Sequence, residues 1–170
     1  MPQAALLLGS GFVATPTVEL LSNAGVHVTV ACRTLASAQK LAAGFANTTS
    51  LSLDANDTSA LEDAIAKHDV VISLIPYTNH VAVIKAAINA RKHVVTTSYV
   101  SPAMQALDEE VKAAGITVMN EIGVSLNIRD YTNKPADRPS LIRGMTWVSS
   151  SVITLILASK YRPSLRRRHH

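Results

Sequence analysis

The sequence of 170 residues predicts an α/β fold, namely a Rossmann-type doubly wound parallel sheet. Six short apolar segments alternate along the chain with five segments of helical pattern, which is typical of a sheet built from strand–helix units. The strand segments are apolar throughout, as expected where helices cover both faces of a sheet. A glycine-rich turn follows the first apolar segment. Together these observations favour a nucleotide-binding α/β domain over an all-helical or all-β domain.

The first predicted strand and the glycine turn after it carry the main sequence motif of the chain. Residues 4–8 are apolar, Gly9 and Gly11 follow, and the small Ala14 stands at the third position of a G-x-G-x-x-G/A pattern. In that pattern the first glycine permits a tight turn, and the second lets backbone N–H groups approach a pyrophosphate. The amino terminus of the next helix then faces the anion with its positive dipole end. By itself the motif also fits a purely structural turn.

The other elements follow in regular order. Further strands are predicted at residues 26–31, 50–53, 70–74, 93–97 and 116–119, and helices at 12–24, 35–43, 57 or 58 to about 67, 78–90 and 101–115. Thr34 is placed to cap the second helix, either Asp57 or Thr58 caps the third, and Pro102 suits a first helical position. In such a sheet a ligand lies at the carboxyl ends of the strands, between the first and the fourth.

The alternation of strands and helices ends near Gly123. We therefore expect a Rossmann domain over residues 1–123 and a divergent tail, either poorly ordered or packed without a regular pattern, over residues 124–170. The tail contains an apolar segment at 145–159, which is shorter than the roughly 20 residues that span a bilayer. The alternative for this segment is a membrane-surface anchor with Trp147 at one end and the basic residues 160–168 at the other. We expect no membrane contact through the tail.

The composition argues against nucleic acid as a partner. The formal net charge is +4 at pH 7, but four arginines stand in the last nine residues: Arg162, Arg166, Arg167 and Arg168. Without that end the chain is near neutral, so no general polyanion-binding surface is expected. Aromatic residues make up only 4% of the chain, which disfavours a base-stacking platform.

The cysteine content and the start of the chain bear on its compartment. Cys32 is the single cysteine, which excludes an intrachain disulfide and suits a reducing compartment. The apolar start is too short for a secretory signal. We expect a cytoplasmic protein.

The end of the second strand indicates which nicotinamide cofactor is bound. NAD sites place an Asp or Glu there for the ribose 2′-hydroxyl, whereas this chain has Cys32, Arg33 and Thr34. No carboxylate is present to repel a phosphate, and a guanidinium can hold one with charge-assisted hydrogen bonds. The sequence therefore favours NADP, although Arg33 also fits a solvated cation at a strand end.

Polar residues after the later strands are further candidates. Asp54 is placed to accept a hydrogen bond from the adenine amino group, or else to make an ordinary turn. Thr97, Ser98 and Tyr99 end the fifth strand, where nicotinamide and substrate would meet; Tyr99 also fits a rim aromatic. We assign no catalytic residue, because no tyrosine is followed four residues later by a lysine, as proton relays of short-chain dehydrogenases require.

Neither the histidines nor the clustered carboxylates indicate a catalytic or metal site. His27, His68, His80 and His93 are scattered without the spacing of metal ligands, so we expect surface or packed histidines and no metal. Cys32 fits a small core residue. The run at residues 108–110 fits solvated charge on a helix.

Five strings in the chain closely resemble the amino-terminal part of the fungal saccharopine reductases. They are residues 9–13, 28–34, 71–77, 94–99 and 115–123. These enzymes are the NADP-dependent, L-glutamate-forming saccharopine dehydrogenases of the α-aminoadipate route to lysine. The resemblance implies reductive coupling of aminoadipate semialdehyde with glutamate, in which NADPH reduces an imine.

The resemblance also implies roles for individual residues. The glycine turn would hold the pyrophosphate, residues 32–34 the 2′-phosphate and adenosine, residues 54 and 55 the adenine, and residues at the ends of the fourth and fifth strands the nicotinamide side. The implied cofactor residues are Gly9, Ser10, Gly11, Phe12, Val13, Cys32, Arg33, Thr34, Asp54, Ala55, Ile75, Thr97 and Ser98. Ser98 and Tyr99 would contact saccharopine.

The resemblance stops after Gly123. The family continues there with a long second domain that supplies most substrate contacts, and Ser125 stands where the family has an aspartate. We therefore expect a truncated form that binds NADPH with little or no turnover. The alternatives are a non-catalytic nucleotide-binding or partner-binding fragment, and another NADP-dependent Rossmann oxidoreductase. Apolar surface left exposed by a missing domain would favour a homo-oligomer.

Overall fold

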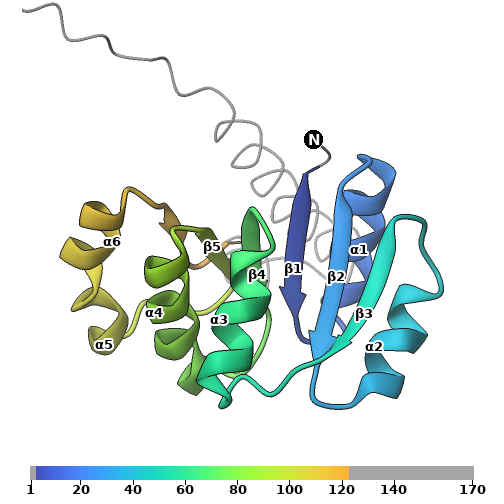
Figure 1. Ribbon diagram of the computed structural model, residues 1–170, viewed down its shortest axis with the longest axis horizontal. Coiled ribbons are helices and arrows are strands. Elements are labelled where there is room, and N and C mark those ends of the chain that lie inside the picture. Colours follow the sequence, from blue (N-terminus) through green and yellow to red (C-terminus); the bar gives the residue numbers. More distant parts are fainter. Residues whose placement is uncertain (1–2, 123–170) are drawn as a thin grey trace, which may run out of the picture.

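The computed structural model describes residues 3–122, and the predicted tail at 124–170 lies outside them. The described chain forms a six-stranded parallel sheet in the order β3-β2-β1-β4-β5-β6 (Figure 1). The strands are β1 (Ala4–Leu8), β2 (His27–Cys32), β3 (Thr48–Ser52), β4 (Val70–Ser73), β5 (His93–Thr96) and β6 (Val118–Met119). The Rossmann-type sheet predicted from the sequence is confirmed, with the strand order reversing between β1 and β4.

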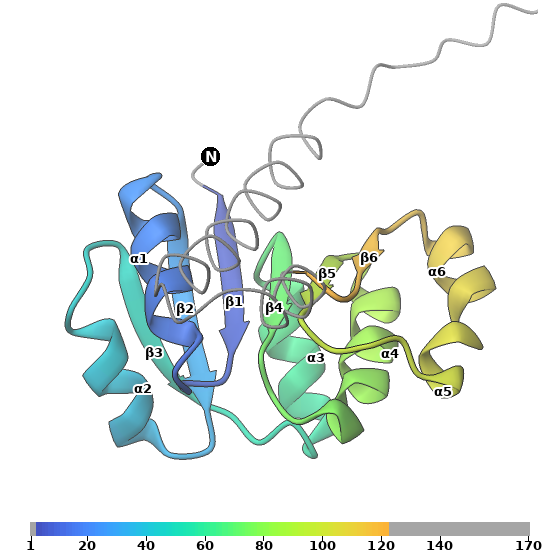
Figure 2. The same ribbon diagram turned by 180° about the vertical axis from the view of Figure 1, so that it is seen from behind.

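Helices cover both faces of the sheet. They are α1 (Ala14–Asn23), α2 (Leu35–Ala42), α3 (Thr58–Ala66), α4 (His80–Ala90), α5 (Pro102–Gln105) and α6 (Asp108–Ala114), with a 3₁₀ turn η1 at Tyr77–Asn79. Figure 1 looks onto the face that α3 and α4 cover, and Figure 2 onto the face that α1 covers. The site described below therefore rests on a layer packed from both sides.

Two hydrophobic clusters, one on each face of the sheet, pack the helices against the strands. Ala5 and Leu7 of β1 pack with α1 residues such as Val18, whereas Leu6 and Leu8 pack with residues of α3 and α4. Leu6 and Leu7 are fully buried, and each such side chain contributes roughly 1.5–3 kcal/mol of transfer free energy. Because neighbouring residues of the central strand β1 enter opposite clusters, this strand must be apolar throughout.

The helix predicted over residues 101–115 is wrong as a single element. Ser101 caps the short helix α5, its hydroxyl accepting a hydrogen bond from Met104 N–H at 3.2 Å. The helix then ends in a tight turn, where Leu107 N–H donates to the Met104 carbonyl at 3.1 Å and the Leu107 side chain is buried. The acidic first turn of α6 favours a fresh helix start there. Burial of Leu107 and the charge at residues 108–110 thus divide the segment.

Two of the predicted helix starts also differ in detail. Asp57 caps α3 as expected, accepting from Ala60 N–H at 3.0 Å. Thr34 holds the N-cap position of α2, but its side chain makes no capping hydrogen bond, so that part of the prediction is wrong. Helix α1 begins at Ala14 and not at Phe12, because residues 12 and 13 belong to the turn after β1.

Candidate functional site

The carboxyl ends of the central strands meet at one edge of the sheet. Leu8, near the end of β1, is in register with Ala31 of β2 on one side and with Ser73 of β4 on the other. Ser73 is in turn in register with Thr96 of β5. The segments that follow these strands hold most of the candidate residues, and the structure therefore brings these residues to a common edge.

The turn after β1 depends on Gly9. Its φ is +111°, and a Cβ on this residue would lie 3.1 Å from the backbone oxygen of Leu74, which is too close for a rigid neighbour. Its N–H donates to the carbonyl of Ala31 at 2.8 Å, which ties the turn to β2. The protein's own backbone therefore requires a glycine here.

Gly11 has a different environment. Nothing in the described chain lies within 4 Å of a Cβ built on it, and its backbone has no positive φ. Neither packing nor backbone conformation demands a glycine at this position. A ligand that approaches the backbone would require a glycine here, since a missing Cβ lets it reach the N–H groups.

The amino terminus of α1 leaves backbone donors unused. The helix has no side-chain cap and no acidic residue in its first turn. Within residues 3–122, the N–H groups of Gly11, Phe12 and Val13 donate to no acceptor, and all three residues are exposed. Unpaired N–H groups and the positive dipole end make this terminus suited to an anion such as a pyrophosphate.

The turn after β2 is linked to the glycine turn through Cys32. The Cys32 thiol donates to the Thr34 carbonyl at 3.1 Å and accepts from the Ser10 hydroxyl at 3.5 Å. Cys32 is half-buried, so its interpretation as a core residue holds only in part. This sulfur contact joins the two turns predicted to hold pyrophosphate and adenosine.

Arg33 projects from the same turn. Its carbonyl accepts from the Ser52 hydroxyl at 3.3 Å, which fixes the backbone between β2 and β3. Its guanidinium is exposed and has no partner among the described residues. The cation is therefore free to bind an incoming phosphate.

Asp54 makes the turn that one of its two interpretations predicted. Its Oδ1 accepts hydrogen bonds from the backbone N–H of Asn56 at 3.0 Å and from Asn56 Nδ2 at 2.9 Å. The residue remains exposed, and Ala55 beside it is half-buried. The adenine contact of Asp54 stays a prediction.

The residues after β4 and β5 form the other side of the edge. Ile75 is partly buried against the α3–α4 cluster, and Thr97 and Ser98 are half-buried. Tyr99 is 56% exposed, which agrees with a rim position.

A buried histidine network joins these strand ends. His80, the first residue of α4, is 1% exposed. Its Nδ1 lies 2.9 Å from the Ser73 hydroxyl, and its Nε2 lies 2.7 Å from the Ser98 hydroxyl and 3.2 Å from that of Thr96. Burial lowers the pKa of His80 below its ordinary value, so the imidazole is neutral near pH 7.

The sequence predicts a packed or surface histidine at position 80, and no sequence pattern predicts this network. The available signal is weak: Ser73 is a polar residue at the end of an apolar strand, and a histidine follows seven residues later. Only the packing of α4 on β4 and β5 brings the four side chains together.

Glu121 fixes the loop that carries Ser98, and it too is missing from the predicted site. Its N–H donates to the Ser98 carbonyl at 3.1 Å, and its Oε1 accepts from Val100 N–H at 3.2 Å. Glu121 adopts a φ of 60°, a conformation that costs about 1–3 kcal/mol in a non-glycine residue. Ser98 is thus held by its backbone as well as by its hydroxyl.

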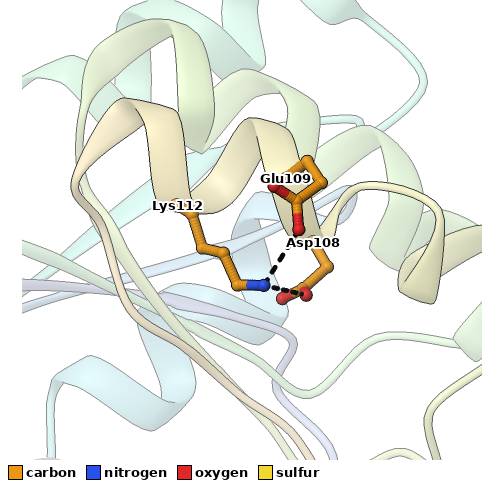
Figure 3. A network of polar contacts seen from close by, with 3 residues as sticks. All are labelled: Asp108, Glu109 and Lys112. Atoms are coloured by element: carbon orange, nitrogen blue, oxygen red, sulfur yellow. Dashed lines mark hydrogen bonds and ion pairs between the residues drawn. The ribbon is translucent and has the colours of Figure 1, made fainter.

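The remaining polar clusters are structural. His68 bonds to the Ala64 carbonyl at 2.7 Å and to the Thr29 hydroxyl at 2.8 Å, at the opposite edge of the sheet. Lys112 pairs with Asp108 at 2.7 Å and with Glu109 at 3.0 Å on the exposed surface of α6, which fits solvated charge (Figure 3).

Among the described residues, no group of three or more His, Cys, Asp or Glu side chains is arranged to hold a metal ion. None of the described helices has the length and apolar character needed to cross a membrane.

Comparison with known proteins gives a consistent result. The family model described as "Saccharopine dehydrogenase NADP binding domain" matches residues 5–119. The chain is 63% identical over 123 residues to a saccharopine dehydrogenase [NADP(+), L-glutamate-forming] of Pyricularia oryzae, covering 72% of this chain and 27% of that protein. It is 56% identical over 124 residues to the protein of the same name from Saccharomyces cerevisiae, covering 72% and 28%.

A solved structure agrees with these relatives. The apo saccharopine dehydrogenase (L-Glu forming) from Saccharomyces cerevisiae superposes with a TM-score of 0.70 and 54% identity, over 72% of this chain and 28% of that one. The chain thus spans between a quarter and a third of the length of the fungal relatives it matches.

Proposed function

Since the chain belongs to the family of saccharopine dehydrogenase NADP-binding domains, we propose that residues 3–122 bind NADPH across the carboxyl edge of the sheet. NADP, the cofactor predicted from the end of β2, is confirmed by this membership. The observation that carries the proposed placement is the uncapped amino terminus of α1 after β1, where the N–H groups of three exposed residues have no acceptor in the described chain. The pyrophosphate would accept hydrogen bonds from them.

The other cofactor contacts in this proposal follow from the same edge. Arg33 binds the 2′-phosphate, with Cys32 and Thr34 beside the adenosine and Asp54 and Ala55 at the adenine. The free guanidinium of Arg33 supports this arrangement, as does the Cys32 sulfur contact that joins its turn to the pyrophosphate turn.

The nicotinamide would then extend toward the ends of β4 and β5. Ile75, Thr97 and Ser98 line that side in the proposal, and Ser98 and Tyr99 contact the substrate. The half-burial of Thr97 and Ser98 supports a position at the inner end of the site, where water is partly excluded.

We further propose for the whole protein the reaction of the relatives' printed name, the NADP-dependent oxidation of saccharopine that forms L-glutamate, run in reverse as the reductive coupling of L-glutamate with aminoadipate semialdehyde. In this reaction an amine and an aldehyde lose water to form an imine, and hydride from NADPH reduces it. The described residues provide the cofactor side, and they supply only Ser98 and Tyr99 as substrate contacts. The chain alone would therefore bind NADPH with little or no turnover.

The proposed compartment is the cytoplasm, which a fluorescent fusion of the full chain would test.

Calorimetric titration of the 170-residue chain with NADPH and with NADH, at one salt concentration, tests the cofactor site. We expect NADPH to bind more tightly. Arg33→Ala should lower NADPH affinity about tenfold or more, the effect of a lost charge-assisted hydrogen bond, and leave NADH affinity unchanged. Lys67→Ala is the matched control, because it removes the same charge from the exposed end of α3, at the opposite edge.

The outcomes separate the parts of the proposal. Absence of binding by either nucleotide would overturn the proposed site. Equal loss of NADPH affinity in Arg33→Ala and Lys67→Ala would remove the specific role of Arg33. NADPH oxidation that requires both aminoadipate semialdehyde and glutamate would contradict binding without turnover, because the chain alone would then carry the activity.

A further inference from the structure

The histidine network consists of His80 and three hydroxyl groups, and each polar hydrogen in it needs an acceptor. His80 contacts Ser73 through Nδ1, and Ser98 and Thr96 through Nε2. A neutral imidazole has one N–H donor and one acceptor nitrogen. The position of the proton therefore decides whether the Ser98 hydroxyl receives a hydrogen bond from His80 or gives one.

Counting the buried hydroxyl protons favours one arrangement. Ser73, Thr96 and His80 are at most 1% exposed, so their polar hydrogens need protein acceptors. With the proton on Nδ1, Nε2 has a single lone pair for the hydroxyls of Ser98 and Thr96. Ser98 is the nearer, so the protons of both Ser73 and Thr96 would need other acceptors.

With the proton on Nε2, the count improves by one. The Ser73 hydroxyl donates to Nδ1, and the Nε2–H donates to Ser98 Oγ at 2.7 Å with Thr96 Oγ1 as a longer second acceptor at 3.2 Å. Three-centre bonds of this kind are common. Of the two fully buried hydroxyls, only that of Thr96 then needs a further acceptor, while the half-buried Ser98 hydroxyl keeps its proton for an acceptor outside the network.

We infer that His80 is a positioning residue that carries its proton on Nε2 and thereby makes the Ser98 hydroxyl a donor toward the bound ligand. Because Ser98 Oγ accepts from Nε2–H, its own proton points away from the network. Ser98 is half-buried and not sealed within the core, so an acceptor on the ligand can receive that proton. A carbonyl or carboxylate oxygen of nicotinamide or substrate has the right chemistry.

The backbone contacts of Ser98 agree with a hydroxyl proton that points toward the ligand. Its N–H donates to Thr96 Oγ1 at 3.1 Å, and its carbonyl accepts from Glu121 N–H at 3.1 Å. These two backbone contacts and the contact of Oγ with Nε2 leave, among the described residues, the O–H as the one hydrogen-bonding group of Ser98 still to be used. The inference rests on the proposed function to the extent that the ligand is NADPH.

A double-mutant cycle with NADPH as the probe tests the ligand part. Ser98→Ala and His80→Asn should each lower NADPH affinity about three- to tenfold, as expected for one neutral hydrogen bond. If His80 acts through Ser98, His80→Asn causes no further loss in the Ser98→Ala background. Equal losses in both backgrounds would overturn the inference in favour of a structural role.

Two further variants sharpen this cycle. His80→Gln can place an amide N–H near the position of Nε2, whereas the shorter His80→Asn cannot, so Gln should restore most of the affinity. His68→Asn removes another buried histidine at the opposite edge and should leave affinity unchanged. Equal affinity of the Gln and Asn variants would contradict the inference.

The tautomer itself can be measured in the unchanged, ligand-free chain. Two-bond proton–nitrogen NMR correlations of the labelled protein distinguish a protonated ring nitrogen from an unprotonated one. We expect His80 to be protonated on Nε2, and protonation on Nδ1 would overturn the inference even if the variants fail to fold. Failure of the unchanged chain to bind NADPH would instead overturn the proposed function and the ligand part of this inference together.

Discussion

The two sides of the carboxyl edge of the sheet present different chemical groups to a ligand. On the β1 side the site consists of backbone: a turn with a positive φ at Gly9, an open position at Gly11 and unpaired N–H groups at the start of α1. On the β4–β5 side it consists of side chains, with His80 buried between three hydroxyls. The first side offers fixed donors to any anion, whereas the second can direct one proton toward one acceptor. We therefore expect the β1 side to bind the anionic part of the nucleotide and the β4–β5 side to orient one hydrogen-bond acceptor of the ligand.

Changing Gly9 and Gly11 one at a time separates a glycine that the fold requires from one that only a ligand would require. Gly9→Ala should lower the free energy of unfolding by about 2 kcal/mol or more, because it combines an unfavourable φ with the close Leu74 oxygen. Gly11→Ala should leave it within about 0.5 kcal/mol, since its Cβ meets no protein atom. Urea denaturation of both variants measures the difference.

The same pair separates fold from binding. Gly11→Ala should lower NADPH affinity about tenfold while its stability is kept, because the new methyl group blocks the approach to the N–H groups. Unchanged affinity in that variant would mean that no ligand group comes near Gly11, and the backbone-built side would need another explanation.

A smaller effect on stability distinguishes Asp57, whose side chain caps a helix, from Thr34, whose side chain does not. Asp57→Ala should cost about 1 kcal/mol of stability, as loss of a helix N-cap does, because its carboxylate holds the Ala60 N–H. Thr34→Ala should cost only a few tenths of that, since its hydroxyl makes no cap bond. If both variants lose the same stability, the cap assignment at Asp57 is contradicted.

The smallest and most gradual effect concerns pH. Burial lowers the pKa of both His68 and His80 below the ordinary value of about 6.5. Below that pH the unfolded chain binds protons that the folded chain does not, so their contribution to stability is fully present above pH 6.5 and falls as the pH is lowered toward the folded pKa values.

Urea denaturation at several pH values between about 5.5 and 7.5 checks this sign. Stability should decrease toward the acidic end, and the slope should be shallower in a His68→Gln, His80→Gln double variant. Stability that rises on acidification across this range would mean that the buried imidazoles are charged in the fold.

The difference between the two sides also explains what could be predicted from the sequence. A glycine turn is a local constraint, so Gly9, Gly11 and the strand before them predict the fold and the pyrophosphate position together. Cys32–Thr34 indicate the cofactor because their place at the end of β2 follows from the same strand count. The sheet order needs no more than this regular alternation.

The parts that could not be predicted depend on contacts between distant residues. Ser73, His80, Thr96 and Ser98 are ordinary residue types at uneven spacing, and they meet only when α4 packs on two strands. The break between α5 and α6 depends on where the Leu107 side chain finds a place in the core. Neither feature has a period or motif that a sequence pattern could carry.

Gly11 has a consequence for anyone who redesigns this domain. A procedure that optimises residues 3–122 for folding alone finds no reason to keep a glycine at a position with open space and an ordinary φ. It would choose a side chain that restricts the unfolded chain and gain stability. The product would be a more robust scaffold with an obstructed nucleotide site. We therefore expect Gly11 to be needed for binding of the nucleotide and not for the fold.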